Sequence, residues 1–356
     1  MHSDELAQLL SLGLTVFQLD TERSFASSIS HLDRLESPPM VVECVHEKGA
    51  HDWTSLIHIA QASGPHKRLL IELVNRGYHL FRAHERGSLF VHRHHIDRVW
   101  DKIESGEYIY TEDHLVYQLS FPEQRRPGRL LVVFSPVASN RFTQFLDRHF
   151  SISFKSIGKY LHDDTLILRI ADLGGVVGSF YLPTTYDPQN NEKVQRLIRS
   201  IASKYRIPEK RIVLYGASKG GTGALYTALQ TGFRCVTIDP IVSRRSPKKD
   251  PYYAYTAIFP EDREKLFLRL AAEKASAGWG ESHITVVTSP GSAEHLPIHR
   301  LAAKSPLARC TQLLIVHHPG IERHADVGPR TVPTTVATLN NALVGLNHSP
   351  GVYHLR

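Results

Sequence analysis

Cysteine is scarce in this sequence, and the few cysteines stand far apart. Cys44, Cys235 and Cys310 each lie within or beside an apolar run of the 356-residue chain. Their spacing is not paired as in a disulfide framework or a thiolate metal site. We therefore expect three buried, reduced thiols, and no residue pattern predicts a metal or an organic cofactor.

The sequence also lacks a long hydrophobic run. No segment approaches the roughly 18 consecutive apolar residues that a membrane-spanning helix needs. The first 20 residues have neither the basic region nor the cleavage site of a signal peptide. We expect a cytoplasmic protein without a membrane span, whose oligomeric state the sequence leaves open.

The sequence has fewer acidic than basic residues, and its formal net charge is +7. Its 22 histidines add further positive charge at low pH. Such an excess favours anionic partners, for example a phosphorylated donor or an acidic glycan. The compact basic clusters at 123–129 and 244–249 contain no row of aromatic residues, so we expect no nucleic-acid partner. The histidine-rich segment 90–97 is interpreted as a solvated basic face and not as a metal site.

The pattern of apolar residues divides the chain near residue 105. Residues 1–105 contain short apolar runs and two helix-like segments and predict a small, mixed α/β accessory domain. Residues 106–356 begin with a hairpin pattern, after which strands and helices alternate. Strands are expected at 129–134, 165–173, 211–216, 234–239, 283–289 and 310–318, and helices at 191–205, 219–232, 295–304 and 332–345. Continuous apolar strands between helices predict a mostly parallel sheet covered on both faces, with an insertion at about 244–280 as a cap over the substrate pocket.

One glycine-rich stretch, "GASKG" at 216–220, follows an apolar strand and opens a helix. G-x-S-x-G at such a position is the nucleophile elbow of the α/β-hydrolase fold, because a sharp turn needs small neighbours and presents the serine above the sheet. The spacing matches neither a phosphate-binding P-loop nor a dinucleotide-binding motif. We therefore predict the α/β-hydrolase fold, with Ser218 as a nucleophile.

A serine needs a base and an acid, which on this fold follow it in the order acid, histidine. His324 lies after the last predicted strand and is the expected base, with His317 and His318 as alternatives. Two carboxylates compete for the acid. Glu294 follows the penultimate strand and is preferred, and Asp239, at the end of the preceding strand, is the alternative.

The oxyanion of the reaction requires two backbone N–H groups. The first is expected from Lys219, directly after the nucleophile, at the start of a helix. The second is expected after the strand 129–134, from Ser135 or Val137, because Pro136 between them has no N–H.

The elbow carries a resemblance to a known group of proteins. "YGASKGGTGALYTAL", preceded by "IPEKRIVL", resembles the serine elbow of the XcbB/CpsF capsular polysaccharide biosynthesis group and, more distantly, the O-acetyltransferase of the accessory Sec system. "ADLGGVVGSFYLP" and "RHADVG" agree with it more loosely. The resemblance covers roughly residues 105–345 and implies a cytoplasmic serine enzyme in surface-glycan or secondary-metabolite assembly.

These features together predict a serine esterase or O-acyltransferase that works through an acyl-enzyme. The donor would be a small ester or thioester, and the acceptor would be water or a saccharide hydroxyl. The alternative is a catalytically inactive hydrolase-fold subunit that serves a glycan-assembly or secretion system through its interactions.

Overall fold

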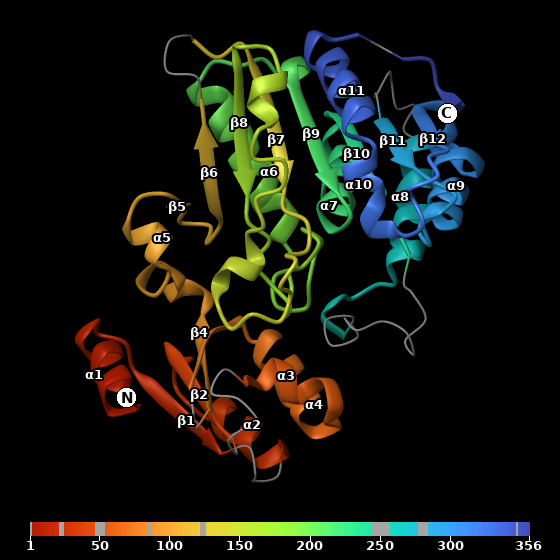
Figure 1. Cartoon of the computed structure of the whole chain (residues 1–356). Helices are drawn as coiled ribbons and strands as arrows, with labels where there is room; N and C mark the ends of the chain where they lie inside the picture. The colour runs from red at the N-terminus through yellow and green to blue at the C-terminus, as the bar shows by residue number, and fades with distance from the viewer. Residues whose placement is uncertain are drawn as a thin grey trace.

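The computed structural model describes residues 2–20, 25–46, 54–84, 87–121, 126–243, 257–276, 284–346 and 348–356. Within these residues the chain forms a four-stranded and a nine-stranded sheet. Figure 1 shows the small sheet and its helices at the N-terminal end and the large sheet beyond them.

The small sheet is mixed and has the strand order β1-β2-β4-β3. β1 and β2 are parallel, whereas β4 pairs antiparallel with both β2 and β3. Its strands and helices are α1 (His2–Ser11), β1 (Val16–Asp20), α2 (Phe25–Asp33), β2 (Val41–Val45), α3 (Leu56–Ala62), α4 (Gly64–Val74), β3 (Tyr78–His84) and β4 (Gly87–His92). The small mixed α/β fold expected for the N-terminal part is therefore confirmed.

The large sheet has the order β13-β12-β11-β10-β9-β7-β8-β6-β5. Its strands are β5 (Ile109–Tyr110), β6 (Val116–Ser120), β7 (Arg129–Phe134), β8 (Thr165–Ile170), β9 (Ile212–Ala217), β10 (Arg234–Ile238), β11 (Ile284–Thr288), β12 (Thr311–Val316) and β13 (Gly351–Leu355). Only β6 runs antiparallel to its neighbours, β8 and β5. The central strands are buried on both faces because nearly every residue in them is apolar.

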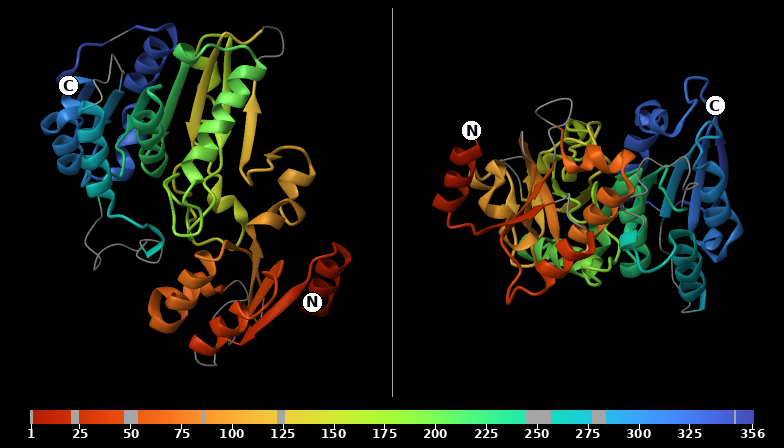
Figure 2. Two further views of the ribbon diagram at one scale, coloured as in Figure 1. Left: turned by 180° about the vertical axis from the view of Figure 1, so that it is seen from behind. Right: turned by 90° about the horizontal axis from the view of Figure 1, so that it is seen from below.

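Helices cover both faces of the large sheet. Alternate strand residues pack on one side against α6 (Asn190–Lys204), α7 (Lys219–Thr231), α8 (Arg263–Ser276) and α9 (His295–Lys304). The other residues pack against α10 (His324–Arg330) and α11 (Val332–Val344). Figure 2 shows α6 in front of the sheet from behind, whereas α11 is in front in Figure 1. The α/β sandwich predicted from the apolar strands is confirmed.

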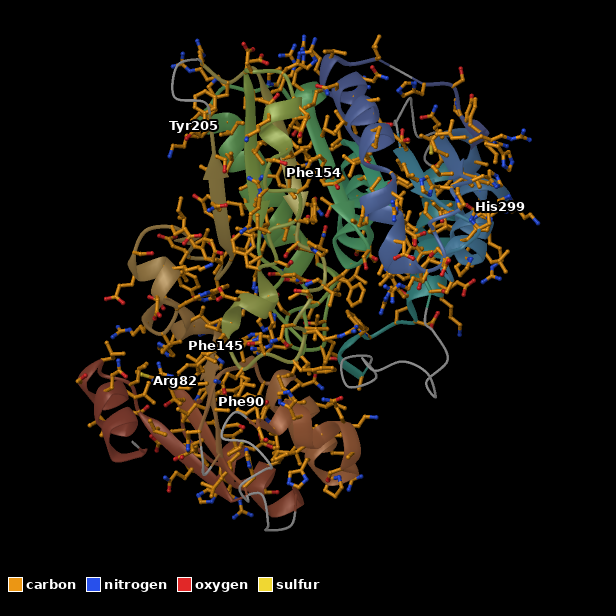
Figure 3. The ribbon with its side chains drawn as sticks, viewed as in Figure 1. Arg82, Phe90, Phe145, Phe154, Tyr205 and His299 are labelled. Atoms are coloured by element: carbon orange, nitrogen blue, oxygen red, sulfur yellow. The ribbon has the colours of Figure 1, made fainter. Side chains whose placement is uncertain are left out.

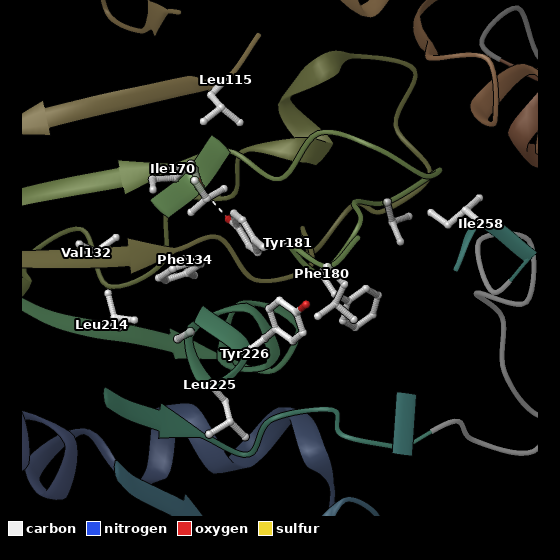
Figure 4. Close-up of a cluster of buried hydrophobic side chains, with 14 of the residues drawn as sticks. Leu115, Val132, Phe134, Ile170, Phe180, Tyr181, Leu214, Leu225, Tyr226 and Ile258 are labelled. Atoms are coloured by element: carbon white, nitrogen blue, oxygen red, sulfur yellow. Dashed lines mark hydrogen bonds between the residues drawn. The ribbon is translucent and has the colours of Figure 1, made fainter. Parts of the chain in front are cut away.

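The core beneath α7 joins three kinds of element (Figure 4). Phe134 comes from β7, Leu214 from β9 and Leu225 from α7, and Phe180 and Tyr181 come from the loop that precedes α6. The Tyr181 hydroxyl is buried and donates to the Ile170 carbonyl at 2.7 Å. This loop is thus tied to the end of β8, close to the elbow.

A third apolar cluster joins the two sheets. Leu89 and Val91 of β4 share it with Val116 of β6 and with Phe150 and Leu173 of the large-sheet part. Figure 3 shows side chains of both parts gathered at this junction, near the labelled Phe145. The small sheet therefore packs against the large-sheet part through a common core.

The junction corrects one prediction. His92 and Arg93 are 6% and 2% exposed, whereas His94 is exposed, so only part of the segment 90–97 is solvated. The Arg93 guanidinium reaches Asp187 at 2.7 Å, and α5 (Asp101–Glu104) follows the turn η1 (Arg93–Arg98). The error arises because packing between the two sheets, which sequence patterns do not report, buries these polar residues.

Three further expectations have mixed outcomes. The cysteines are free, with Cys44 and Cys235 buried and Cys310 only partly buried. Of the described helices, none combines the length and apolar character required to span a bilayer. In the predicted cap, residues 244–256 and 277–283 lie outside the described residues, and α8 is the helix described between them.

Candidate active site

The turn between β9 and α7 is sharp and depends on glycine. Ser218 has φ 56° and ψ −121°, a conformation that residues with a side chain rarely adopt. A Cβ on Gly216 would collide with the Gly220 carbonyl, and one on Gly220 would collide with the Phe134 carbonyl of β7. Only glycine lets the turn close against the neighbouring strand, and the turn presents Ser218 at the carboxyl end of β9.

His324 lies between Ser218 and a carboxylate. Its Nε2 is 2.7 Å from Ser218 Oγ, and its Nδ1 is 2.7 Å from Asp239 Oδ2. Because a carboxylate accepts, Nδ1 carries the proton and Nε2 accepts from the serine hydroxyl. This relay of Ser218, His324 and Asp239 has the hydrogen-bond order that activates a serine.

The surroundings hold Asp239 in place. Asp239 comes directly after β10 and has a φ of 47°, and its side chain is 2% exposed. Thr288 and Ser292 donate their hydroxyls to its two oxygens at 2.7 and 2.5 Å. With His324 as the third donor, the carboxylate has one orientation, toward the imidazole.

The structure reverses the expected preference between the two acids. The two ring nitrogens of His324 are hydrogen-bonded to Asp239 and Ser218, so Glu294 does not orient the imidazole. Glu294 is buried at the N-cap of α9, where its backbone N–H donates to Ser292 Oγ at 3.1 Å. β10 is the immediate neighbour of β9, and this adjacency brings Asp239 to the base.

The alternative bases make other contacts. His317 Nε2 is 2.8 Å from His354 Nδ1 on β13, and His318 Nδ1 accepts the Gly320 N–H at 2.9 Å. His324 is the first residue of the helix α10. The sequence did not predict α10 or β13, because their apolar residues follow neither a helical spacing nor the alternation of a strand.

The two candidates for the second oxyanion donor differ in availability. The Ser135 N–H donates to the buried Tyr181 hydroxyl at 2.6 Å, so it is not available to a substrate. Val137, two residues later, borders the same cavity as Ser218. Lys219 is the first residue of α7, where a backbone N–H has no partner within the helix. The occupied N–H of Ser135 is inconsistent with the role expected for it, and Lys219 and Val137 stay the predicted oxyanion donors.

The Lys219 side chain points away from this cavity. It is fully buried, and its ammonium lies 2.9 Å from Asp172 Oδ2 and 3.0 Å from the Val177 carbonyl. Asp172 also accepts the backbone N–H groups of Ser179 and Phe180, both at 2.9 Å. Asp172 was not predicted as a site residue, because the strand expected at 165–173 included it, whereas β8 ends at Ile170.

Ser218 and His324 open into a cavity of about 560 Å³. Its walls are mostly apolar, with side chains such as Phe154, Ile241 and Val332, and two arginines, Arg141 and Arg263, also border it. Pockets of this size and character hold small organic molecules. The described residues contain no group of three or more histidine, cysteine or acidic side chains that could hold a metal ion.

Comparisons with known proteins find distant likenesses among solved structures. No protein-family model matches the chain, and no curated protein matches it. Similar solved structures include an S-formylglutathione hydrolase from Agrobacterium tumefaciens (13% identity, 67% of this chain and 94% of that chain, TM-score 0.47) and a ferulic acid esterase (10%, 66% and 96%, 0.47). A glycosylation-associated protein complex (Gap123) from Streptococcus agalactiae is similar at 13% identity, over 68% of this chain and 47% of that chain, with TM-score 0.47. These likenesses concern the fold alone. The predicted, mostly parallel α/β sheet is confirmed by its own strand order and strand directions.

Proposed function

We propose that this protein is a serine-dependent acyl-transfer enzyme, an esterase or O-acyltransferase that forms an acyl-enzyme on Ser218. One observation carries the proposal: Ser218, His324 and Asp239 are joined by two successive hydrogen bonds of 2.7 Å in the wall of a cavity. This geometry supplies a nucleophile, a base and an orienting carboxylate in the order that the reaction needs.

The first step forms the acyl-enzyme. Ser218 Oγ attacks the carbonyl carbon of an ester or thioester, and its proton passes to His324 Nε2. The carbonyl oxygen becomes an oxyanion, and we propose that the backbone N–H groups of Lys219 and Val137 donate to it. The bond to the leaving alcohol or thiol then breaks, and His324 returns the proton to that group.

The second step releases the acyl group. Water or a saccharide hydroxyl gives its proton to His324 Nε2, and its oxygen attacks the acyl carbon. The bond to Ser218 Oγ breaks and the serine takes the proton back, so that the enzyme is regenerated. Throughout, Asp239 stabilises the imidazolium and keeps Nε2 directed at the serine.

The biological setting is proposed from the sequence resemblance to capsular polysaccharide biosynthesis proteins. A saccharide hydroxyl as acceptor would make the enzyme an O-acyltransferase, whereas water would make it an esterase. The predicted cap has one structural support, because Arg263 at the start of α8 borders the cavity. The predicted boundary between residues 105 and 106 and the cytoplasmic location stay proposals.

A fluorophosphonate probe tests the function directly. We expect the wild-type protein to be labelled once, on Ser218, with the site established by mass spectrometry of the peptide. Ser218→Ala should abolish labelling, and His324→Ala should slow it at least about 1,000-fold, because the serine loses its base. Ser203→Ala, on the exposed side of α6, is the matched control and should label normally.

A folded wild-type protein that the probe does not label would contradict the proposed enzymatic function. Folding would be judged by a cooperative thermal transition and by circular dichroism. That result would favour the interaction subunit, which keeps the hydrolase fold without turnover.

A further inference from the structure

We propose that the catalytic cavity binds a substrate whose apolar chain carries a hydroxyl, ether or carbonyl oxygen, and that the hydroxyls of Tyr215 and Thr335 bind this oxygen. This inference rests on the proposed acyl-transfer function and names the class of substrate for the same site. It makes Tyr215 and Thr335 specificity residues, separate from the three residues of the relay.

Tyr215 is a buried tyrosine in the wall of the catalytic cavity. It lies in β9, shortly before Ser218, and is 5% exposed. Its side chain belongs to the apolar cluster that the sheet forms with α10 and α11. The cavity that it borders is also bordered by Ser218 and His324, so a group bound at Tyr215 shares one space with the relay.

The Tyr215 hydroxyl has no hydrogen-bond partner among the residues that the structure describes. The buried Tyr181 shows the contrast, because its hydroxyl donates to the Ile170 carbonyl at 2.7 Å and accepts the Ser135 N–H at 2.6 Å. Burial raises the pKa of Tyr215 to about 12, so its hydroxyl keeps the proton at neutral pH and can donate it. A hydroxyl without a partner in an apolar wall costs free energy, and a ligand oxygen that accepts from it removes this cost.

Thr335 of α11 supplies a second hydroxyl to the same cavity wall. It is 2% exposed and borders the cavity. The Thr331 hydroxyl donates to the Val327 carbonyl, one turn back, at 2.8 Å, and the Thr338 hydroxyl donates to the Thr334 carbonyl at 2.7 Å. This backward hydrogen bond is common for hydroxyls on helices. The Thr335 hydroxyl makes no such bond, and none with any other residue in the described part of the chain.

The two hydroxyls come from opposite walls of one apolar part of the cavity. Tyr215 belongs to the sheet, and Leu339 of α11 shares an apolar cluster with it. Thr335 precedes Leu339 by one helical turn and therefore lies on the same face of α11. Ile238 and Val332 also border the cavity. An apolar chain can therefore pack between the sheet and α11, with its one oxygen at the two hydroxyls.

The experiment moves one oxygen along the chain of the substrate. The parent ester is p-nitrophenyl hexanoate, and its ether isosteres are p-nitrophenyl propoxyacetate, p-nitrophenyl 3-ethoxypropanoate and p-nitrophenyl 4-methoxybutanoate. For the alcohol, pentyl acetate is compared with 2-ethoxyethyl acetate and 3-methoxypropyl acetate, and acid release is followed by pH-stat titration. The series that responds identifies whether the acyl group or the alcohol lies between Tyr215 and Thr335.

We expect Tyr215→Phe to lower kcat/KM for one ether about 3- to 10-fold more than for its hydrocarbon parent, because the bound oxygen loses one hydrogen bond. Thr335→Val, which is also isosteric, should change the same ratio in the same direction. Tyr226→Phe is the matched control. Tyr226 lies in α7, is 7% exposed and is not among the described residues that border the catalytic cavity. Loss of its hydroxyl should leave every ratio unchanged.

Equal changes of kcat/KM for every ether and its parent in Tyr215→Phe would overturn the proposal, because Tyr215 would then only support the wall. If that variant does not fold, Thr335→Val decides between the same two outcomes. A ratio that Tyr226→Phe lowers as much as Tyr215→Phe does would also overturn it.

A binding measurement separates this inference from the acyl-transfer function. Titration of Ser218→Ala with hexanamide and its three ether isosteres, and with N-pentylacetamide and its two, is followed by ligand-observed NMR and needs no turnover. If Tyr215→Phe in this background weakens one ether about 3- to 10-fold more than its parent, the oxygen site is supported even if the fluorophosphonate probe fails. An unchanged ratio, or no binding of any of these amides, in a protein that the probe labels would reject the oxygen site alone.

Discussion

At the scale of single residues, Asp239 shows how strongly one carboxylate can be constrained. It has a positive φ, is almost wholly buried and accepts hydrogen bonds from Thr288, Ser292 and His324. A carboxylate held by three donors has little freedom to turn away from the imidazole. Its orientation is therefore part of the folded state and need not be created when a substrate binds.

The assignment of the acid gives a prediction at this scale. We expect Asp239→Asn to slow the acylation of Ser218 by on the order of 10³- to 10⁴-fold, because an amide favours the wrong imidazole tautomer. Glu294→Gln should slow it far less. The measurement is the rate of fluorophosphonate labelling for each variant, corrected for the folded fraction, and the opposite ranking would return the role of the acid to Glu294.

At the scale of elements, the elbow is tied to the loop between β8 and α6. The Lys219 ammonium and the Asp172 carboxylate are both fully buried, 2.9 Å apart. Burial lowers the pKa of Lys219, and the nearby Asp172 carboxylate opposes this shift. Gly178 belongs to the same contact, since a Cβ there would collide with both charged groups. The pair thus anchors the residue whose N–H is proposed to receive the oxyanion.

Removing one member of this pair should leave a buried charge without its partner. We expect Lys219→Met and Asp172→Asn each to lower the free energy of unfolding by about 3–5 kcal/mol, measured by urea denaturation. The double variant should lose less than the sum of the two. A double variant that loses the full sum would show that the two groups contribute independently.

At the scale of the whole molecule, a group of histidines lies where the two sheets meet. The ring centres of His92 and His94 are 4.6 Å apart, and those of His94 and His114 are 4.1 Å apart. His92 ends β4 of the small sheet, and His114 lies between β5 and β6 of the large sheet. His92 Nε2 also lies 3.4 Å from the hydroxyl of Tyr186, in the loop before α6. Protonation of this group would place like charges in the junction.

The pKa values of His92 and His114 are both lowered in the folded protein. Burial, with smaller contributions from neighbouring cations, lowers the pKa of His92 to about 4 and that of His114 to about 4. The charged and titratable neighbours involved are Arg93, His94, His95, Asp113 and Lys193. Between about pH 6.5 and pH 4 the unfolded chain therefore binds more protons than the folded one.

This difference predicts the direction of the pH dependence. The free energy of unfolding should be highest near pH 7 and should fall as the pH drops from about 6.5 toward 4. The reason is that lowering the pH stabilises whichever state binds more protons, and in this range that is the unfolded state. Urea denaturation across this range is the measurement. His92→Gln should flatten the dependence, whereas His162→Gln, at an exposed position, should not. An unchanged slope in His92→Gln would exclude His92 as a source.

Local sequence determined most of the elements and the sharp turn at Ser218. The alternation of apolar strands with helices predicts the parallel sheet, since each pattern depends on residues only a few positions apart. The elbow is equally local, because the collisions that exclude side chains from Gly216 and Gly220 arise within one tight turn and the strand beside it. The turn that presents Ser218 at the end of its strand could therefore be predicted before any contact was known.

Only the tertiary structure decided which acid contacts the base. Asp239 and Glu294 both follow strands of one sheet, and local patterns do not distinguish them. The hydrogen bonds of His324 to Asp239 and Ser218 join residues 85 and 106 positions apart. The adjacency of β10 to β9, the burial of His92 and the place of Arg263 in the cavity wall depend on such contacts. Contacts between distant segments follow from how whole elements pack, and the sequence around each residue does not encode that packing.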